Sequence, residues 1–193
     1  SRAAALAYAT TVNVFTTWSE GYWHPWLKVL SPTTGLSVTV NPTGARQGVI
    51  ARTHLAKGTA KAAGGSEDGK ILGILGLEAD IQEVDYDLLY PARINCAQSE
   101  GGYSFNGNVT LDPTGEVLES GIRFYLLLLK KALKTGLAWV KFEFNTPATR
   151  AKVVRNIVGK LTQDWRNGQL DGKNISEAFF VVCDESNNDP TTR

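Results

Sequence analysis

The chain has 193 residues, of which 42% are hydrophobic and 20% are charged, and its formal net charge at pH 7 is +1. This composition predicts one globular domain with a sizeable core, and a charge this close to zero does not favour a general nucleic-acid-binding protein. The longest apolar run, Phe124–Leu129, is far too short to cross a bilayer, so we expect no membrane insertion.

The charges are unevenly distributed along the chain. Residues 66–120 contain eleven acidic and two basic residues, whereas residues 121–193 contain seven acidic and twelve basic ones. Such segregation suits a molecule whose acidic patch meets the basic patch of a second copy, because complementary potentials set register and association rate. The alternative is that folding interleaves the segments and removes the pattern.

The first third of the sequence predicts β-structure broken by turns. Residues 9–18 are rich in β-branched and aromatic side chains, and two alternating apolar runs in residues 25–40 flank Ser-Pro-Thr-Thr-Gly, which predicts a hairpin. Residues 47–52 form a further short candidate strand. Residues 57–70 are glycine-rich and small, so they predict a loop.

The middle of the chain mixes short strands with one helix. Residues 71–80 are apolar but interrupted by glycines, which predicts a short strand or an irregular core segment. A helix is predicted over residues 80–90, capped by Asp80 with Glu83 completing a capping box. We expect its inner stripe to be Ile81, Val84 and Leu88. Residues 93–98 and part of residues 99–111 predict two more strands.

A long helix is predicted over residues 117–135, with Gly136 as its C-terminal cap. One stripe at a spacing of three or four residues is apolar: Leu118, Ile122, Tyr125, Leu129 and Leu133. Phe124, Leu127 and Leu128 lie off that stripe, so the middle turns are apolar almost all round. Such a helix is either buried on both sides or covered by another subunit.

The C-terminal third predicts strand, helix, strand. Residues 137–144 and 177–184 are the strand candidates, and Thr146 and Pro147 are suitable N-cap and first residues for a helix between them. The expected core stripe of this helix is Ala151, Val154, Val158, Leu161 and Trp165. Elements of these kinds predict an α/β (α+β) fold, a mixed β-sheet flanked by helices in a single compact domain.

Basic residues gather on the helix predicted after Pro147. Lys152, Arg155 and Arg166 fall within about 60° of one another, away from the core stripe and with no acid in that sector. The pattern fits either a solvated polar face or a docking face for an acidic partner.

Nothing in the sequence points to catalysis or to a cofactor. His24 and His54 have no motif partner, and Cys96 and Cys183 lack metal-ligand spacing, so we expect reduced, half-buried thiols and no metal site. No nucleophile elbow, zinc-protease or phosphate-loop motif is present. An aromatic cluster could line a sugar site, although packing is the simpler interpretation: Trp18, Tyr22, Trp23 and Trp26.

Several segments, taken in order, resemble the contractile tail sheath protein family, a group that includes phage, bacteriocin and type VI secretion sheaths. They are "GYWHPWLKVLSPTTG", "NPTGARQGVIARTHLAKGTAKAAGG", "GLEADIQEVDYDLLYPARINC", "GLAWVKFEFN" and "WRNGQLDGKNISEAFFVVCDESNN". The similarity covers most of residues 20–188. The family's tryptophan–Gly–Ala–Arg–Thr strand is represented only by "FNGNVTL", which keeps Gly107 and Thr110 but lacks the arginine.

The resemblance implies a non-enzymatic structural subunit. Sheath subunits stack as hexameric rings around a tail tube, add strands to the sheets of their neighbours through extended arms, and contract to drive the tube through a cell envelope. We therefore expect residues 1–193 to be one conserved inner sheath domain, a fragment of a longer chain without its outer domains and C-terminal arm. The implied locations are the virion tail and, during assembly, the host cytoplasm.

The implied partners are other sheath subunits, the tube, the baseplate and the tail terminator, with no direct nucleic-acid contact. In related sheaths this domain faces the tube, so we expect an acidic tube surface to contact Lys152, Arg155, Lys160 and Arg166. Two alternatives remain at this stage. One is a small α/β enzyme with a site assembled from scattered residues, and the other is an aromatic-lined carbohydrate-binding module.

Overall fold

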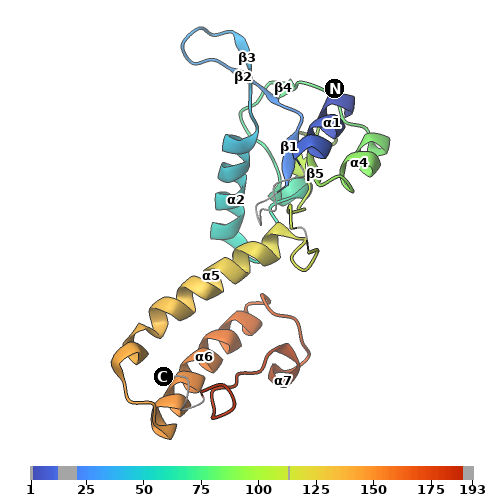
Figure 1. The fold of residues 1–193 in the computed structure, drawn as a ribbon. Helices are drawn as coiled ribbons and strands as arrows, with labels where there is room; N and C mark the ends of the chain where they lie inside the picture. The colour runs from blue at the N-terminus through green and yellow to red at the C-terminus, as the bar shows by residue number, and fades with distance from the viewer. Residues whose placement is uncertain (1, 13–20, 113, 189–193) are drawn as a thin grey trace. The chain divides into compact units, whose positions relative to one another are not determined.

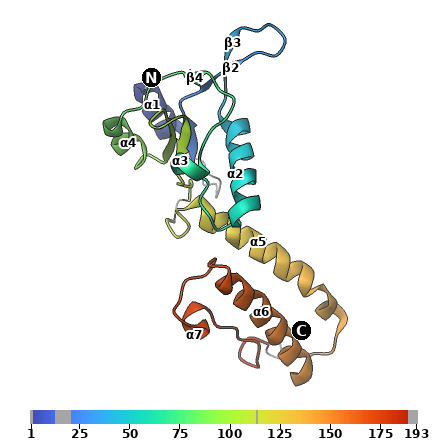
Figure 2. The same cartoon turned by 180° about the vertical axis from the view of Figure 1, so that it is seen from behind.

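A computed structural model describes residues 2–12, 21–112 and 114–188 of the chain (Figures 1 and 2). The contacts between residues divide the chain into two compact units, residues 1–124 and residues 125–193. The described elements of the first unit are α1 (Arg2–Val12), β1 (Tyr22–His24), β2 (Leu27–Leu30), β3 (Ser37–Val40), α2 (Thr43–Lys57), α3 (Gly65–Asp68), β4 (Gly76–Leu77), α4 (Glu83–Leu89), β5 (Ile94–Gln98) and β6 (Ser104–Asn106).

The central sheet of the first unit has the strand order β1-β5-β6. Strand β1 pairs parallel to β5, with Trp23 opposite Asn95, and β6 pairs antiparallel to β5. Four of the five β5 residues are buried, so this strand lies inside the unit. The side chain of Asn95 is also buried and bridges the backbone of Val109, accepting from its N–H at 2.9 Å and donating to its carbonyl at 3.0 Å.

A second small sheet has the order β3-β2-β4 and contains the predicted hairpin. Strands β2 and β3 pair antiparallel, with Val29 opposite Val38, and β4 pairs with the other edge of β2. The turn is closed by the Ser31 N–H donating to the Leu36 carbonyl at 2.9 Å. The hairpin predicted from residues 25–40 is therefore confirmed.

The main core of the first unit lies between the central sheet and α2. Its buried members are Leu27, Val49, Ile50, Ala63, Ile71, Ala97 and Phe105. Arg46 of α2 is only 1% exposed, and its guanidinium lies 4.4 Å from the centre of the Trp23 ring. It also donates a hydrogen bond to the Ala63 carbonyl. A buried cation is thus held by an aromatic face and a backbone acceptor.

The second unit is built on two long helices. Helix α5 (Ser120–Gly136) begins in the first unit and continues into the second. It is followed by the 3₁₀ helix η1 (Ala138–Phe142), then α6 (Pro147–Arg166) and α7 (Ile175–Ala178). The small mixed and antiparallel sheets together with helices confirm the predicted α+β class.

Four predicted strands differ in the structure. Residues 47–52 lie inside α2, because Val49, Ile50 and Thr53 follow Arg46 at the spacing of a buried helical face. Residues 9–12 belong to α1, and the rest of the strand predicted over residues 9–18 lies outside the described residues. Residues 137–144 contain η1. Residues 177–178 are the last two of α7, and residues 179–184 follow that helix with no strand pairing in the described part of the chain.

The helix predicted over residues 80–90 begins later than expected. Helix α4 starts at Glu83, with Gln82 as its cap and a capping box closed by Asp85, so the box assigned to Asp80 and Glu83 is wrong. Ile81 is buried as predicted, but Val84 is 69% and Leu88 50% exposed. The inner-stripe prediction therefore fails for these two residues, because the shorter helix instead buries Leu89.

Candidate assembly surface

Helix α6 has the start that the sequence predicts. Thr146 is its N-cap and accepts a hydrogen bond from the Thr149 N–H at 3.2 Å, and Pro147 occupies the first turn, where its missing N–H costs nothing. Of the predicted core stripe, Leu161 is buried, Val154, Val158 and Trp165 are half-buried, and Ala151 is exposed.

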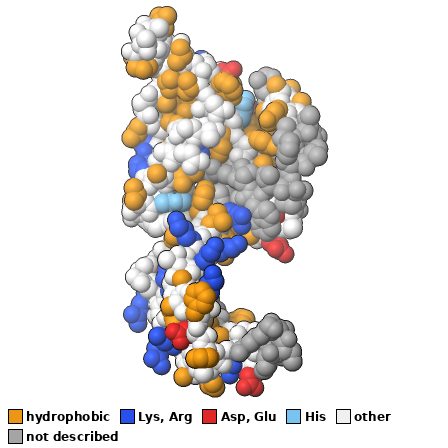
Figure 3. All heavy atoms as spheres, turned by 60° about the vertical axis from the view of Figure 1, so that its left-hand side comes forward, with side chains coloured by type: hydrophobic (Ala, Val, Ile, Leu, Met, Phe, Trp, Pro, Cys, Tyr) orange, Lys and Arg blue, Asp and Glu red, His pale blue; other side chains and the backbone are white. Residues whose placement is uncertain are grey.

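Three of the four predicted tube-contact residues are exposed to solvent. Lys152, Arg155 and Arg166 are exposed, and none makes an ion pair among the described residues. The Lys152 ammonium lies 4.2 Å from the centre of the Trp139 ring, a cation–π contact that orients it. Figure 3 shows several Lys and Arg side chains, among hydrophobic ones, on the visible face of the second unit.

Lys160 is in a different environment from the other three. It is half-buried, and its ammonium donates to the carboxylate of Asp164, one turn further along α6. Asp164 is 2% exposed and also accepts a hydrogen bond from the Tyr125 hydroxyl of α5 at 3.1 Å. Burial and the neighbouring carboxylate raise the pKa of Tyr125. This link cannot be predicted from local spacing, because Tyr125 and Asp164 are 39 residues apart.

A turn after α6 holds the chain against that helix. The Trp165 indole N–H donates to the Gly172 carbonyl at 2.9 Å, and Gly168 has a φ of 71°, which favours glycine. Asn174 then caps α7 by accepting from the Glu177 N–H at 3.1 Å. These contacts fix where the chain leaves α7 and enters the segment that was predicted as a strand.

The two unpaired strand candidates of the second unit carry exposed phenylalanines. Phe142 is 92%, Phe144 85% and Phe180 87% exposed. Glu143 and Phe179 have extended backbone angles, yet neither segment pairs with a strand in the described parts of the chain. Large apolar side chains that are exposed together mark interaction surfaces, and unpaired extended backbone is a template for strand addition.

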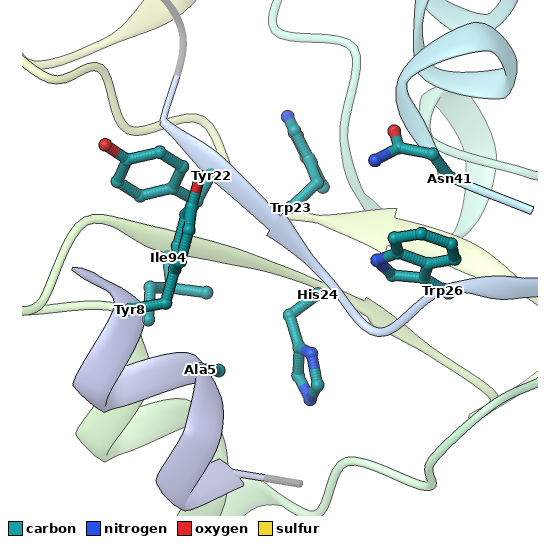
Figure 4. A pocket seen from close by; sticks show the side chains of 8 residues that line it. All are labelled: Ala5, Tyr8, Tyr22, Trp23, His24, Trp26, Asn41 and Ile94. Atoms are coloured by element: carbon teal, nitrogen blue, oxygen red, sulfur yellow. The ribbon is translucent and has the colours of Figure 1, made fainter. Parts of the chain in front are cut away.

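The predicted aromatic cluster lines a hollow in the first unit (Figure 4). Its volume is about 440 Å³. Trp23 packs edge-on against Phe105 with the ring centres 4.8 Å apart, and Tyr22 packs in the same way against Tyr8 at 5.5 Å. Trp26 is 46% exposed, while Trp18 lies outside the described residues. Packing thus occupies two of the four rings proposed for sugar stacking.

Reactive groups are few and separated in the part of the chain that the structure describes. Among these residues, no group of three or more His, Cys, Asp and Glu side chains is arranged to hold a metal ion. Cys96 is buried, which raises the pKa of its thiol to about 12, and Cys183 is half-buried; neither forms a disulfide. No described helix is long and apolar enough to span a membrane.

Comparison with solved structures finds the same fold in contractile injection systems. A chain of the anti-feeding prophage (AFP) baseplate, in its 6-fold symmetrised structure, matches with a TM-score of 0.77 and 19% identity over 96% of this chain. The sheath complex of the extracellular contractile injection system PVC, in its contracted state, matches with a TM-score of 0.77 and 21% identity over 91%. The contracted AFP helical sheath gives 0.74 and 19% over 93%.

This likeness establishes the fold that the sequence resemblance predicted. The chain spans about half the length of these structures, 55%, 49% and 55% of the three chains in turn. No protein-family model and no curated protein sequence matches the chain.

Proposed function

We propose that this chain is the inner domain of a contractile sheath subunit, a structural part that polymerises around a tail tube and repacks on contraction. The observation that carries the proposal is the fold shared with sheath chains over more than nine-tenths of the sequence. The described residues form no evident catalytic constellation, and the surfaces that they expose are suited to assembly.

The exposed phenylalanine segments support strand addition by neighbouring subunits. A strand from another copy would pair with the extended backbone near Phe144 or Phe180 and would cover rings that are 85% and 87% exposed. Each subunit would then be complete only within the polymer. We propose further that the subunits form stacked hexameric rings and that their contraction drives the tube through a cell envelope.

The basic face of α6 is the proposed tube contact. Lys152, Arg155 and Arg166 are exposed and free to meet an acidic tube surface. Lys160 is also a proposed tube contact, but its ammonium is already paired with the buried carboxylate of Asp164. We therefore expect Lys160 to position α6 more than to bind the tube.

Charge reversal on this face tests the tube contact. In the longer protein, Arg155→Glu with Arg166→Glu should lower the amount of sheath that assembles on purified tube by at least about tenfold at low salt. The matched control reverses two exposed lysines of the first unit, Lys28 and Lys70. If the α6 variant assembles on the tube as well as the unmodified protein does, this face is not the tube contact.

Electron microscopy of the longer protein tests the proposal as a whole. Rings or helical tubes, alone or on a tube, are the expected outcome, and a protein that remains monomeric under all conditions contradicts it. Baseplate and tail-terminator proteins are the further proposed partners. Whether the particle is a virion tail or an extracellular injection device is decided by purifying it and looking for a DNA-filled head.

A further inference from the structure

Helix α5 presents a basic and apolar face that the second unit leaves uncovered. Leu127, Lys130, Lys131 and Lys134 follow at intervals of three, one and three residues, which places them on one side of the helix. Leu127 is 46% exposed, and all three lysines are exposed. The helix contains no acidic residue. We call this set the lysine face.

The opposite side of α5 is the one that packs within the second unit. Ala132, Leu133 and Gly136 of α5 line a small apolar cavity of about 160 Å³ together with Ile157 of α6. Tyr125 on the same side bonds to the buried Asp164. The lysine face is therefore directed away from α6.

Helix α4 of the first unit carries a surface of complementary character. Glu83, Val84, Asp87 and Leu88 lie on one side of the helix and are exposed, Val84 by 69% and Leu88 by 50%. Beside them is a polar groove of about 820 Å³ whose further acids are Asp80 and Glu100. We call α4 with this groove the acidic face.

The acids of this face are largely without cations. No ion pair involves Glu83, Asp87 or Glu100 among the described residues, and Asp80 is held only by the Ser99 hydroxyl and the Gln82 amide, at 2.8 and 2.7 Å. The three lysines on α5 are likewise unpaired in the described structure.

We infer that the lysine face of one copy docks on the acidic face of a second copy. Each face combines exposed aliphatic side chains with charges of a single sign, so their contact would bury leucine and valine and would pair lysines with carboxylates. Because the two faces are different, the contact is heterologous and repeats from copy to copy, as a ring or helical polymer requires. This docking rests on the proposed function, because a sheath requires contacts between copies, and the lysine and acidic faces are the surfaces that would make them.

Paired charge reversals test this docking. Sedimentation of the 193-residue chain is compared at low salt for three variants, with circular dichroism confirming that each is folded. The lysine-face variant is Lys130→Glu, Lys131→Glu and Lys134→Glu; the acidic-face variant is Glu83→Lys, Asp87→Lys and Glu100→Lys; the control is Lys28→Glu, Lys70→Glu and Lys173→Glu.

We expect the unmodified chain to associate at low salt and to dissociate at about 1 M salt, where the screening length is about 3 Å. Each face variant alone should associate at least about tenfold more weakly, and the control should not. An equimolar mixture of the two face variants should regain association, because each then supplies the surface that the other has lost. Rescue between separate chains can only come from a contact between copies.

Four results would overturn the inference: an unmodified chain that stays monomeric, a mixture no better than its components, a control as weak as the face variants, or weaker association in the lysine-face variant alone. The last result would mean that α5 contacts a surface other than the acidic face. Failure here leaves the proposed function standing if microscopy of the longer protein shows tubes. Conversely, if the mixture regains association but microscopy of the longer protein shows no tubes or rings, only the proposed function is contradicted.

Discussion

The buried Asp164 offers a direct test of how the second unit is held together. The change Asp164→Ala removes the acceptor of the Tyr125 hydroxyl and the partner of the Lys160 ammonium. Tyr125 is 5% exposed, so its hydroxyl would be left without a partner, whereas the Lys160 side chain is 35% exposed and can turn to water. We expect the free energy of unfolding of this unit to fall by about 2–4 kcal/mol.

Urea unfolding combined with amide hydrogen exchange of α5 and α6 would measure this loss and localise it. Tyr125→Phe alone should cost about 1–2 kcal/mol, and adding it to Asp164→Ala should cost little more, because both hydrogen-bonding groups are then gone. A loss below about 0.5 kcal/mol for Asp164→Ala, the scatter typical of surface substitutions, would refute the reasoning.

Two further changes probe burial and exposure. A thiol reagent at mildly alkaline pH should modify Cys183 and leave Cys96 intact in the folded chain. Cys96 is protected because it is fully buried and the pKa of its thiol is raised to about 12. Modification of both cysteines in the native protein would contradict this prediction. Phe180→Ser should change unfolding free energy by less than about 0.5 kcal/mol, since the ring is 87% exposed, yet should weaken assembly of the longer protein. Leu55→Ser, at an 89% exposed position on α2, is its control, and equal assembly by both variants would count against a role for Phe180 in assembly.

The elements that the sequence predicted well are those specified by local chemistry. The hairpin over residues 25–40 has a turn with its own backbone closure, and α6 begins at a threonine cap followed by proline. Residues 93–98, just after Pro91, were predicted as a strand and contain β5. In each case the determining residues lie within a few positions of one another.

The predictions that failed depend on distant contacts. Val49 and Ile50 favour a strand by propensity, but they lie in α2, on the buried side from which Arg46 also stacks on Trp23 across the unit. In the same way, Lys160 was assigned to the tube contact because nothing near it in the sequence shows that Asp164 is buried. Side-chain networks between elements cannot be derived from spacing on one helix.

The two strands predicted in the second unit are absent from the described structure for a different reason. Residues 137–144 alternate and residues 177–184 were also predicted as a strand, yet neither segment pairs with a strand in the described structure, and Phe142, Phe144 and Phe180 are exposed. A strand pattern needs a partner strand and a cover for its apolar face, and one chain supplies neither here. Under the proposed function both come from neighbouring copies, so the pattern describes the polymer rather than the subunit. The exposed Leu127 on α5 has the same explanation, because a helix whose middle turns are apolar almost all round needs a second surface to cover them.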